Sequence, residues 1–208
     1  MRKQTKLVAV LSAAALLAVG ASMTSFAATR NPWVDLGDGD WAYVGSDGER
    51  VTSEWRRNGS DYFFLDENGT MARSRLITPD DGDGDAYYYV GGNGVRLKNQ
   101  WVRVMNDDQE SVNDQTPEMF WYYLRENGKA VRADERSEFK RILIDYNGKK
   151  RTFFFDAEGR MVTGWIEDEE KGDIYYCDPE GDGSAVTDWQ QLEVPEDWNS
   201  SGEKEYDY

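Results

Sequence analysis

Histidine is absent from the 208-residue chain, and cysteine occurs only once, as Cys177. Without an imidazole base, serine and cysteine triads that depend on histidine are excluded, and so are most catalytic zinc sites. Cys177 has no second cysteine with which to form an internal disulfide. Its place in the segment "IYYC" matches that of Leu, Val or Phe in similar segments, so we expect it to pack as a small apolar residue.

Long apolar runs are also scarce. One run, at residues 7–21, follows Arg2, Lys3 and Lys6 and precedes the small residues of "SFA". This three-part pattern is typical of a secretory signal peptide cleaved after Ala27, and the run is short for a membrane span. We therefore expect residues 1–27 to be removed on export, and no later stretch is apolar enough to hold the protein in a membrane.

Positive charge is in short supply. After cleavage, 21 Lys and Arg would stand against 40 Asp and Glu, a net charge of −19. Such a surface repels nucleic acid and anionic lipid, so we expect neither as a partner.

The many carboxylates are only weak evidence for a catalytic or metal-binding site. A pair of them could hydrolyse a glycoside, but among 40 acidic residues a chance pair is expected. The stretch "DDGDGDA" places Asp81, Asp83 and Asp85 at alternate positions, as in a calcium loop. Ala86 and Gly92 stand where such a loop needs Gly and Glu, so we expect a turn here and no metal site.

What the chain does have is aromatic residues in a repeated arrangement. Each copy has a run of aromatic residues, three turn-type residues and a glycine, and an anchor residue follows 6 to 8 positions later. The anchors Trp33, Trp55, Leu76 and Trp101 are 22, 21 and 25 residues apart, and Trp189 follows Trp165 by 24. The copies read "WAYVGSDG" (41–48), "YFFLDENG" (62–69), "YYYVGGNG" (87–94), "WYYLRENG" (121–128), "TFFFDAEG" (152–159) and "IYYCDPEG" (174–181).

A fixed period of about 20–25 residues is typical of a solenoid. Each aromatic run has strand character, and the glycine after it suits a tight turn that needs positive φ. "YNGKK" (146–150) predicts a further Asn-Gly hairpin turn. Because one such hairpin is marginally stable alone, we predict an all-β solenoid in which about six stacked β-hairpins span residues 33–189.

Two places interrupt the period. Residues 102–119 separate Trp101 from its aromatic run and predict an exposed loop or hairpin extension. Near 134–140 the expected Trp is missing, and either the anchor is lost or Phe139 or Ile142 replaces it. Residues 28–32 form a short leading segment, and residues 190–208 an acidic tail.

The segments "DAEGRMVTGW" and "WYYLRENGKAV" resemble the cell-wall-binding repeats of Gram-positive bacteria, also called choline-binding repeats, and the related glucan-binding repeats of secreted glucosyltransferases. Residues 153–165 match the family pattern almost fully, and the other units match it in part. The resemblance implies a β-hairpin solenoid with ligand cages between consecutive hairpins. In such a cage, aromatic rings and often a Met surround a quaternary ammonium, which ring faces attract.

The family residues are carried over unevenly. Only Trp41 and Trp121 keep the Trp that opens the aromatic run, and only Trp165 keeps the preceding glycine. The family Met occurs as Met71 and Met161. The resemblance therefore implies two ligand cages, while the units around Thr152 and Ile174 serve only for stacking. The first cage is Trp33, Trp41 and Tyr43 closed by Tyr62 or Phe64, and the second is Trp101, Trp121 and Tyr123 closed by Phe154.

Together these observations predict an exported, non-catalytic binding protein. The repeats leave no room for a catalytic domain, so we expect neither an enzyme nor a cofactor. The expected partner is a cell-wall polymer, either the choline of teichoic acid or a glycan, and the expected location is the cell surface, without a covalent link to the wall. The alternative is a structural or adhesive protein whose solenoid surface binds another protein and no small ligand.

Overall fold

The computed structural model describes residues 32–81, 85–106, 117–168 and 171–187. The chain divides into two units, residues 1–31 and 32–208, and all the described residues belong to the second. The expected signal peptide, Trp189, the acidic tail and residues 107–116 of the expected loop therefore lie outside the described residues. Within the described part, no helix is long and apolar enough to cross a membrane.

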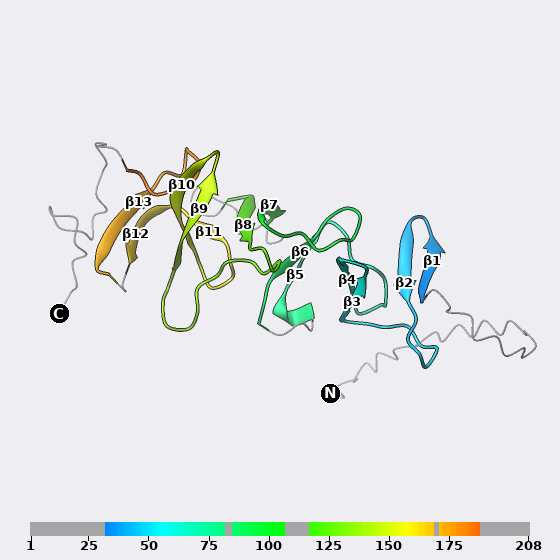
Figure 1. The fold of residues 1–208 in the computed structure, drawn as a ribbon. Coiled ribbons are helices and arrows are strands. Elements are labelled where there is room, and N and C mark those ends of the chain that lie inside the picture. The colour runs from blue at the N-terminus through cyan, green and yellow to red at the C-terminus, as the bar shows by residue number, and fades with distance from the viewer. Residues whose placement is uncertain (1–31, 82–84, 107–116, 169–170, 188–208) are drawn as a thin grey trace, which may run out of the picture. The chain divides into compact units, whose positions relative to one another are not determined.

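The described residues form thirteen strands, and antiparallel pairing joins these into six successive hairpins (Figure 1). The hairpins are β1–β2, β3–β4, β5–β6, β7–β8, β9–β10 with β11 as a third strand, and β12–β13. No α-helix occurs in these residues, which confirms the predicted all-β solenoid of hairpin repeats. The elements are β1 (Trp33–Gly37), β2 (Asp40–Tyr43), β3 (Glu54–Asn58), β4 (Asp61–Leu65), β5 (Arg75–Ile77), the 3-10 helix η1 (Pro79–Asp81), β6 (Tyr88–Val90), β7 (Gln100–Met105), β8 (Met119–Leu124), β9 (Lys140–Tyr146), β10 (Lys149–Phe155), β11 (Met161–Val162), β12 (Gly164–Asp168) and β13 (Asp173–Cys177).

One register recurs in five of the six hairpins. The anchor residue of the first strand stands directly opposite the third residue of the aromatic run. Opposed residues point to the same face of a strand pair, so the two side chains pack together. The pairs are Trp33↔Tyr43, Trp55↔Phe64, Leu76↔Tyr89, Trp101↔Tyr123 and Trp165↔Tyr176.

The fifth hairpin differs at this position. Arg141 stands opposite Phe154, where the other hairpins place Trp or Leu. Ile142 stands opposite Phe153, and Phe139 precedes β9, so neither takes the anchor's register position. The expected Asn-Gly turn is confirmed, because Asn147 and Gly148 both have positive φ, 53° and 75°, between β9 and β10.

Glycine ends each aromatic run in a turn of positive φ, as expected. In the first five units these are Gly48, Gly69, Gly94, Gly128 and Gly159, with φ between 73° and 88°. In the sixth unit the glycine with positive φ is Gly183, at 76°, rather than Gly181. The sequence alignment on Gly181 was therefore wrong, because this turn carries two additional residues before the chain returns to pair Ala185 with Cys177.

In the stack, the anchor face of each hairpin contacts the opposite face of the next hairpin. The anchor, first and third aromatic positions lie on one face of a hairpin, and the second aromatic position lies on the other. The second residue of each run packs against the preceding anchor, as the ring pairs Trp33–Phe63, Trp55–Tyr88 and Trp101–Phe153 show, at 5.2, 5.2 and 4.9 Å between centroids. This alternation builds the core mainly from rings.

Cys177 confirms the expectation of a small apolar packing residue. It is fully buried in a cluster with Phe154, Ile166 and Ala185. Burial raises the pKa of its thiol to about 12, so the thiol stays protonated and unreactive in the folded protein.

Candidate functional site

The stacking places four residues around each junction between hairpins. We call this set an inter-hairpin site. It consists of the anchor and the opening residue of one hairpin, the second aromatic residue of the next, and the residue two positions after the next turn glycine. The five sites are Trp33, Trp41, Phe63 and Met71; Trp55, Tyr62, Tyr88 and Arg96; Leu76, Tyr87, Tyr122 and Ala130; Trp101, Trp121, Phe153 and Met161; and Arg141, Thr152, Tyr175 and Ala185.

A repeated backbone hydrogen bond fixes the fourth residue of these sites. Its N–H donates to the carbonyl of the opening residue in the preceding hairpin. The bonds are Met71 to Trp41, Arg96 to Tyr62, Ala130 to Tyr87 and Ala185 to Thr152, at 2.7 to 2.8 Å. In the fourth site, Met161 and Trp121 line one pocket. The position occupied by the family Met is therefore held next to the opening aromatic residue by the fold itself.

The fourth site has the most aromatic surroundings. Trp101 lies with its ring centroid 5.2 Å from that of Tyr123 and 6.5 Å from that of Trp121. Phe153 contacts Trp101 edge-on at 4.9 Å, and Phe155 stacks on it at 5.8 Å. The expected closing residue, Phe154, is buried on the other face of β10 against Tyr175, at 5.0 Å.

A pocket of roughly 500 Å³ opens at this site. Trp101, Trp121 and Met161 contribute to its walls, and 41% of the Trp121 side chain remains exposed. The other lining residues include members of β8, of the end of β9 and of the turn after β13, which brings Asp182 and Gly183. The pocket thus combines ring faces, a thioether and a carboxylate.

Asp182 is the acidic group of this pocket. Burial works to raise its pKa, but hydrogen bonds from the hydroxyl and N–H of Ser184 and the charge of Arg151 hold the pKa below its ordinary value. The Arg151 Nη1 lies 2.5 Å from an Asp182 carboxylate oxygen. Asp182 therefore stays ionised at neutral pH, as one half of an ion pair with Arg151 beside the aromatic surfaces.

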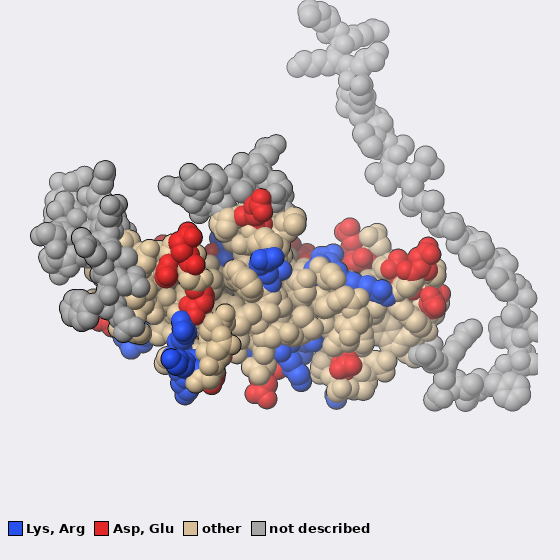
Figure 2. Space-filling view, turned by 90° about the horizontal axis from the view of Figure 1, so that it is seen from above, with Lys and Arg blue, Asp and Glu red and all other residues tan. Residues whose placement is uncertain are grey.

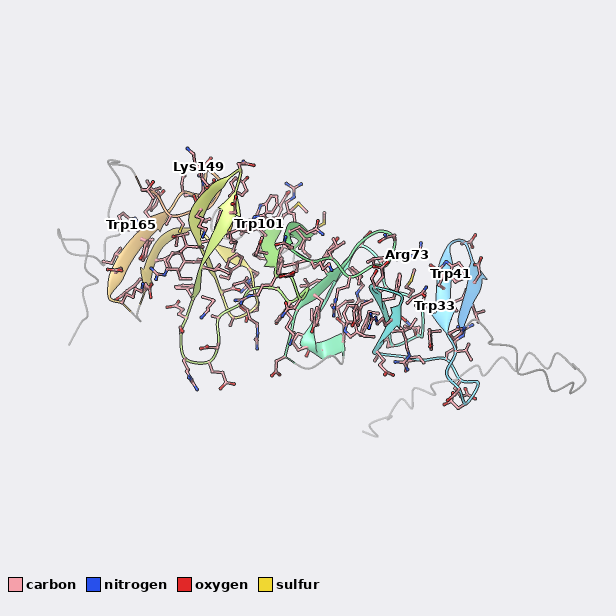
Figure 3. The ribbon with its side chains drawn as sticks, viewed as in Figure 1. Trp33, Trp41, Arg73, Trp101, Lys149 and Trp165 are labelled. Carbon is pink, nitrogen blue, oxygen red and sulfur yellow. The ribbon has the colours of Figure 1, made fainter. Side chains whose placement is uncertain are left out.

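The first site is similar in composition. Trp33 contacts Tyr43 edge-on at 5.2 Å, and Figure 3 shows Trp33 and Trp41 on the same hairpin, β1–β2. The next hairpin closes it with Phe63, at 5.2 Å from Trp33, instead of Tyr62 or Phe64. Phe64 is fully buried against Trp55 on the opposite face of β4, and Tyr62 belongs to the second site. The Arg56 guanidinium lies 5.2 Å from the Tyr43 centroid.

The structure brings Trp33, Trp41 and Tyr43 together on one hairpin and Trp101, Trp121 and Tyr123 on another, and the ring of the next hairpin that contacts each anchor is Phe63 or Phe153, one position from the expected residue. Strand alternation shows which residues share a face within one hairpin, but the face that the next hairpin presents depends on how the two hairpins stack. Phe63 and Phe153, the second residues of their runs, are the residues that sequence reasoning missed. Whether the nine predicted residues contact a ligand stays a prediction.

A second pocket, of roughly 590 Å³, lies at the third site. Its lining includes Leu76, Tyr87 and Tyr122, with Arg103 and Arg160 among its charged residues. The Arg160 guanidinium lies 5.0 Å from the ring centroid of Phe120, which also lines this pocket. This site has no Trp, and its fourth residue is Ala130.

Charge on the described surface is mixed. On the face shown by Figure 2, acidic and basic side chains are interspersed, with broad uncharged areas between them. Several of the arginines lie over aromatic rings, including Arg56 over Tyr43 and Arg103 over Trp121, at 5.2 and 5.6 Å from the centroids. The chain thus uses its scarce positive charges at the aromatic surfaces.

The stacked hairpins and their inter-hairpin sites define an all-β repeat protein. No family model matches the chain. Residues of this chain align with glucosyltransferase-S of Streptococcus mutans serotype c, 26% identical over 167 residues, which is 74% of this chain and 10% of that enzyme. Glucosyltransferase-I of Streptococcus downei aligns at 26% identity over 151 residues, 73% of this chain and 8% of that enzyme. The chain thus spans about a tenth of the length of the curated relatives it matches.

Solved structures with a similar arrangement include two proteins of Streptococcus pneumoniae. CbpJ superposes with a TM-score of 0.48 at 22% identity, over 84% of this chain and 48% of that protein. Choline binding protein F superposes with a TM-score of 0.47 at 20% identity, over 83% of this chain and 46% of that protein. The repeat pattern and the aligned glucosyltransferase regions support the resemblance of this chain to choline-binding and glucan-binding repeats.

Proposed function

We propose that this chain is an exported, non-catalytic binding protein that attaches to the bacterial cell wall, through a choline-bearing polymer or a glycan. The observation that carries the proposal is the pocket of roughly 500 Å³ at the fourth inter-hairpin site, lined by Trp101, Trp121 and Met161. Rings that are partly exposed in a pocket offer their faces to a ligand, whereas rings needed only for the core are buried.

Two ligand chemistries suit this pocket. Ring faces attract a quaternary ammonium group, at about 0.5–2 kcal/mol per ring. The same rings can stack on the face of a sugar. The likeness to enzymes named as glucosyltransferases also favours a sugar.

The test is retention of the full chain, without the expected signal peptide, on purified cell walls, on immobilised glucan and on a choline matrix. We expect retention on walls and elution by the matching free ligand, either choline or an oligosaccharide. Elution by salt from an amine resin would show only the attraction of a strongly acidic protein. Retention on none of the three surfaces would overturn wall attachment and favour a protein partner.

The variant that carries the test is Trp121→Ala, because this side chain is 41% exposed and its loss leaves the core intact. We expect its affinity for walls to fall about tenfold, within the range of one lost ring contact. The matched control is Trp165→Ala, which removes a Trp that packs on Tyr176 outside the five sites. Equal retention of both variants would show that the pocket is not the attachment site.

A further inference from the structure

The second inter-hairpin site contains a cation that belongs to the chain. The guanidinium carbon of Arg96 lies 4.2 Å from the ring centroid of Tyr62, 5.3 Å from that of Trp55 and 5.2 Å from that of Tyr88. These three rings come from the anchor and opening positions of one hairpin and the second aromatic position of the next. Each distance is within the range of a cation–π contact, so three ring faces converge on one positive charge.

The fold holds Arg96 in this place. Its N–H donates to the Tyr62 carbonyl at 2.8 Å, and Val90 pairs with it as a β-bridge. Gly128 of the following turn covers the side chain, because a Cβ there would lie 2.9 Å from the Arg96 Nε. Backbone contacts therefore fix both the start of the Arg96 side chain and the space around it.

The residues at the equivalent position in other inter-hairpin sites show what Arg96 replaces. In the first and fourth sites this residue is Met71 or Met161, and both of these are covered by a turn glycine in the same way, Gly94 and Gly183. Met carries no charge. The first and fourth sites thus have ring faces without a cation at this position, whereas the second site supplies its own.

We propose that the second inter-hairpin site is a quaternary ammonium site that the chain keeps filled with the Arg96 guanidinium. A covalently attached cation is present at the rings permanently, so a free cation must displace it to bind. The wild-type chain therefore binds no external cation at Trp55, Tyr62 and Tyr88. Removing the guanidinium while keeping the fold opens the site to a quaternary ammonium ion. This inference is independent of wall attachment, since it concerns a different junction and a simple cation.

The experiment compares the number of tetramethylammonium ions bound by the wild-type chain and by Arg96→Met, measured by isothermal titration calorimetry. Met is the natural residue at this position in two other sites, so the variant fits the repeat. We expect Arg96→Met to bind one more ion per chain than the wild type. The added site should disappear in Arg96→Met with Tyr62→Ala. The matched control is Arg57→Met, which removes a guanidinium 5.8 Å from the same Tyr62 ring but none from Trp55 or Tyr88, and we expect no added site.

Three results would overturn the proposal. One is equal stoichiometry for the wild type and Arg96→Met, and another is an added site that survives Tyr62→Ala. The third comes from the wild-type chain alone, which keeps the test decisive if Arg96→Met fails to fold. We expect the Arg96 Nε–H resonance to carry a ring-current shift that saturating tetramethylammonium leaves unchanged. A return of this resonance to the position of a solvated arginine would show that an external cation displaces the guanidinium.

Discussion

Arg141 stands opposite Phe154 across the fifth hairpin, in the register that other hairpins fill with Trp or Leu. Its guanidinium carbon lies 5.7 Å from the ring centroid of Tyr175, the second aromatic residue of the next hairpin. Its Nη1 donates to the Tyr175 hydroxyl at 2.6 Å, and its Nε lies 3.3 Å from Asp168. A cation therefore connects these two hairpins where an apolar anchor connects the others.

Replacing this arginine alone should weaken the junction. In Arg141→Leu the chain gains the anchor found at Leu76, but Asp168, with a side chain only 9% exposed, loses its ion-pair partner. We expect the free energy of unfolding to fall by about 1–3 kcal/mol, measured by urea denaturation. In the matched double variant Arg141→Leu with Asp168→Leu, most of this loss should be recovered, because no uncompensated carboxylate remains. An unchanged stability of Arg141→Leu alone would show that the ion pair contributes nothing.

The stacking rule predicts which rings are energetically coupled. We expect a double-mutant cycle between Trp101→Leu and Phe153→Leu to give a coupling energy of about 0.5–1.5 kcal/mol, because the two rings are in edge-on contact. The control cycle pairs Trp101→Leu with Phe154→Leu, whose ring packs on Tyr175 instead. Its coupling energy should be below about 0.5 kcal/mol. Stronger coupling to Phe154 would contradict the stacking seen in the structure.

The period was accessible from the sequence, because turn glycines and aromatic runs mark each unit directly. Trp101, Trp121 and Tyr123 share one face of one hairpin, as strand alternation predicts. Phe153 was missed because the side on which the next hairpin stacks is a tertiary property, and it depends on the chain between the hairpins.

The roles of two arginines were also beyond the sequence. Arg141 takes the anchor position only in the register that the Asn-Gly turn sets between β9 and β10. Arg96 was visible at the Met position of its unit, but which rings a long side chain reaches is decided by packing around it. The sequence motif therefore identifies which positions form each site, whereas the packing of long side chains decides which sites contain a side-chain cation.

The turn glycines should differ in their tolerance of alanine. Gly159 has φ 83°, and a Cβ there would lie 3.1 Å from the Val131 carbonyl oxygen. Gly148 has φ 75° but no atom within 4 Å of such a Cβ. Both alanine variants carry the strain of positive φ, about 1–2 kcal/mol, and Gly159→Ala should lose about 1–3 kcal/mol more because backbone must move. Equal losses in thermal or urea unfolding would show that the close approach at Gly159 is relieved without cost.

Alkaline pH should weaken the fold through Tyr122. Burial raises the pKa of this phenol to about 12 from an ordinary value of 10.0. Between these two values the unfolded chain loses the proton while the folded chain keeps it, so stability is present below about pH 10 and falls as the pH rises.

The measurement is the free energy of unfolding as a function of pH from 9 to 12, compared with Tyr122→Phe as the control. Other tyrosines contribute equally to both curves. We expect a shallower decline in the variant, which lacks this group. Identical slopes would contradict the assigned burial of Tyr122.

The backbone bonds from Met71 to Trp41, Arg96 to Tyr62 and Ala130 to Tyr87 each join a hairpin to the one directly before it. Energetic coupling that runs between neighbours makes stability a sum of unit and junction terms, as in a one-dimensional Ising chain. Unfolding of such a molecule starts at its weakest junction and spreads to the neighbouring hairpins. Each hairpin that is added or deleted changes the number of unit and junction terms, and with it the cooperativity of unfolding. A ligand bound in an aromatic pocket at a junction would therefore stabilise that junction and raise the free energy needed to unfold the hairpins on either side of it.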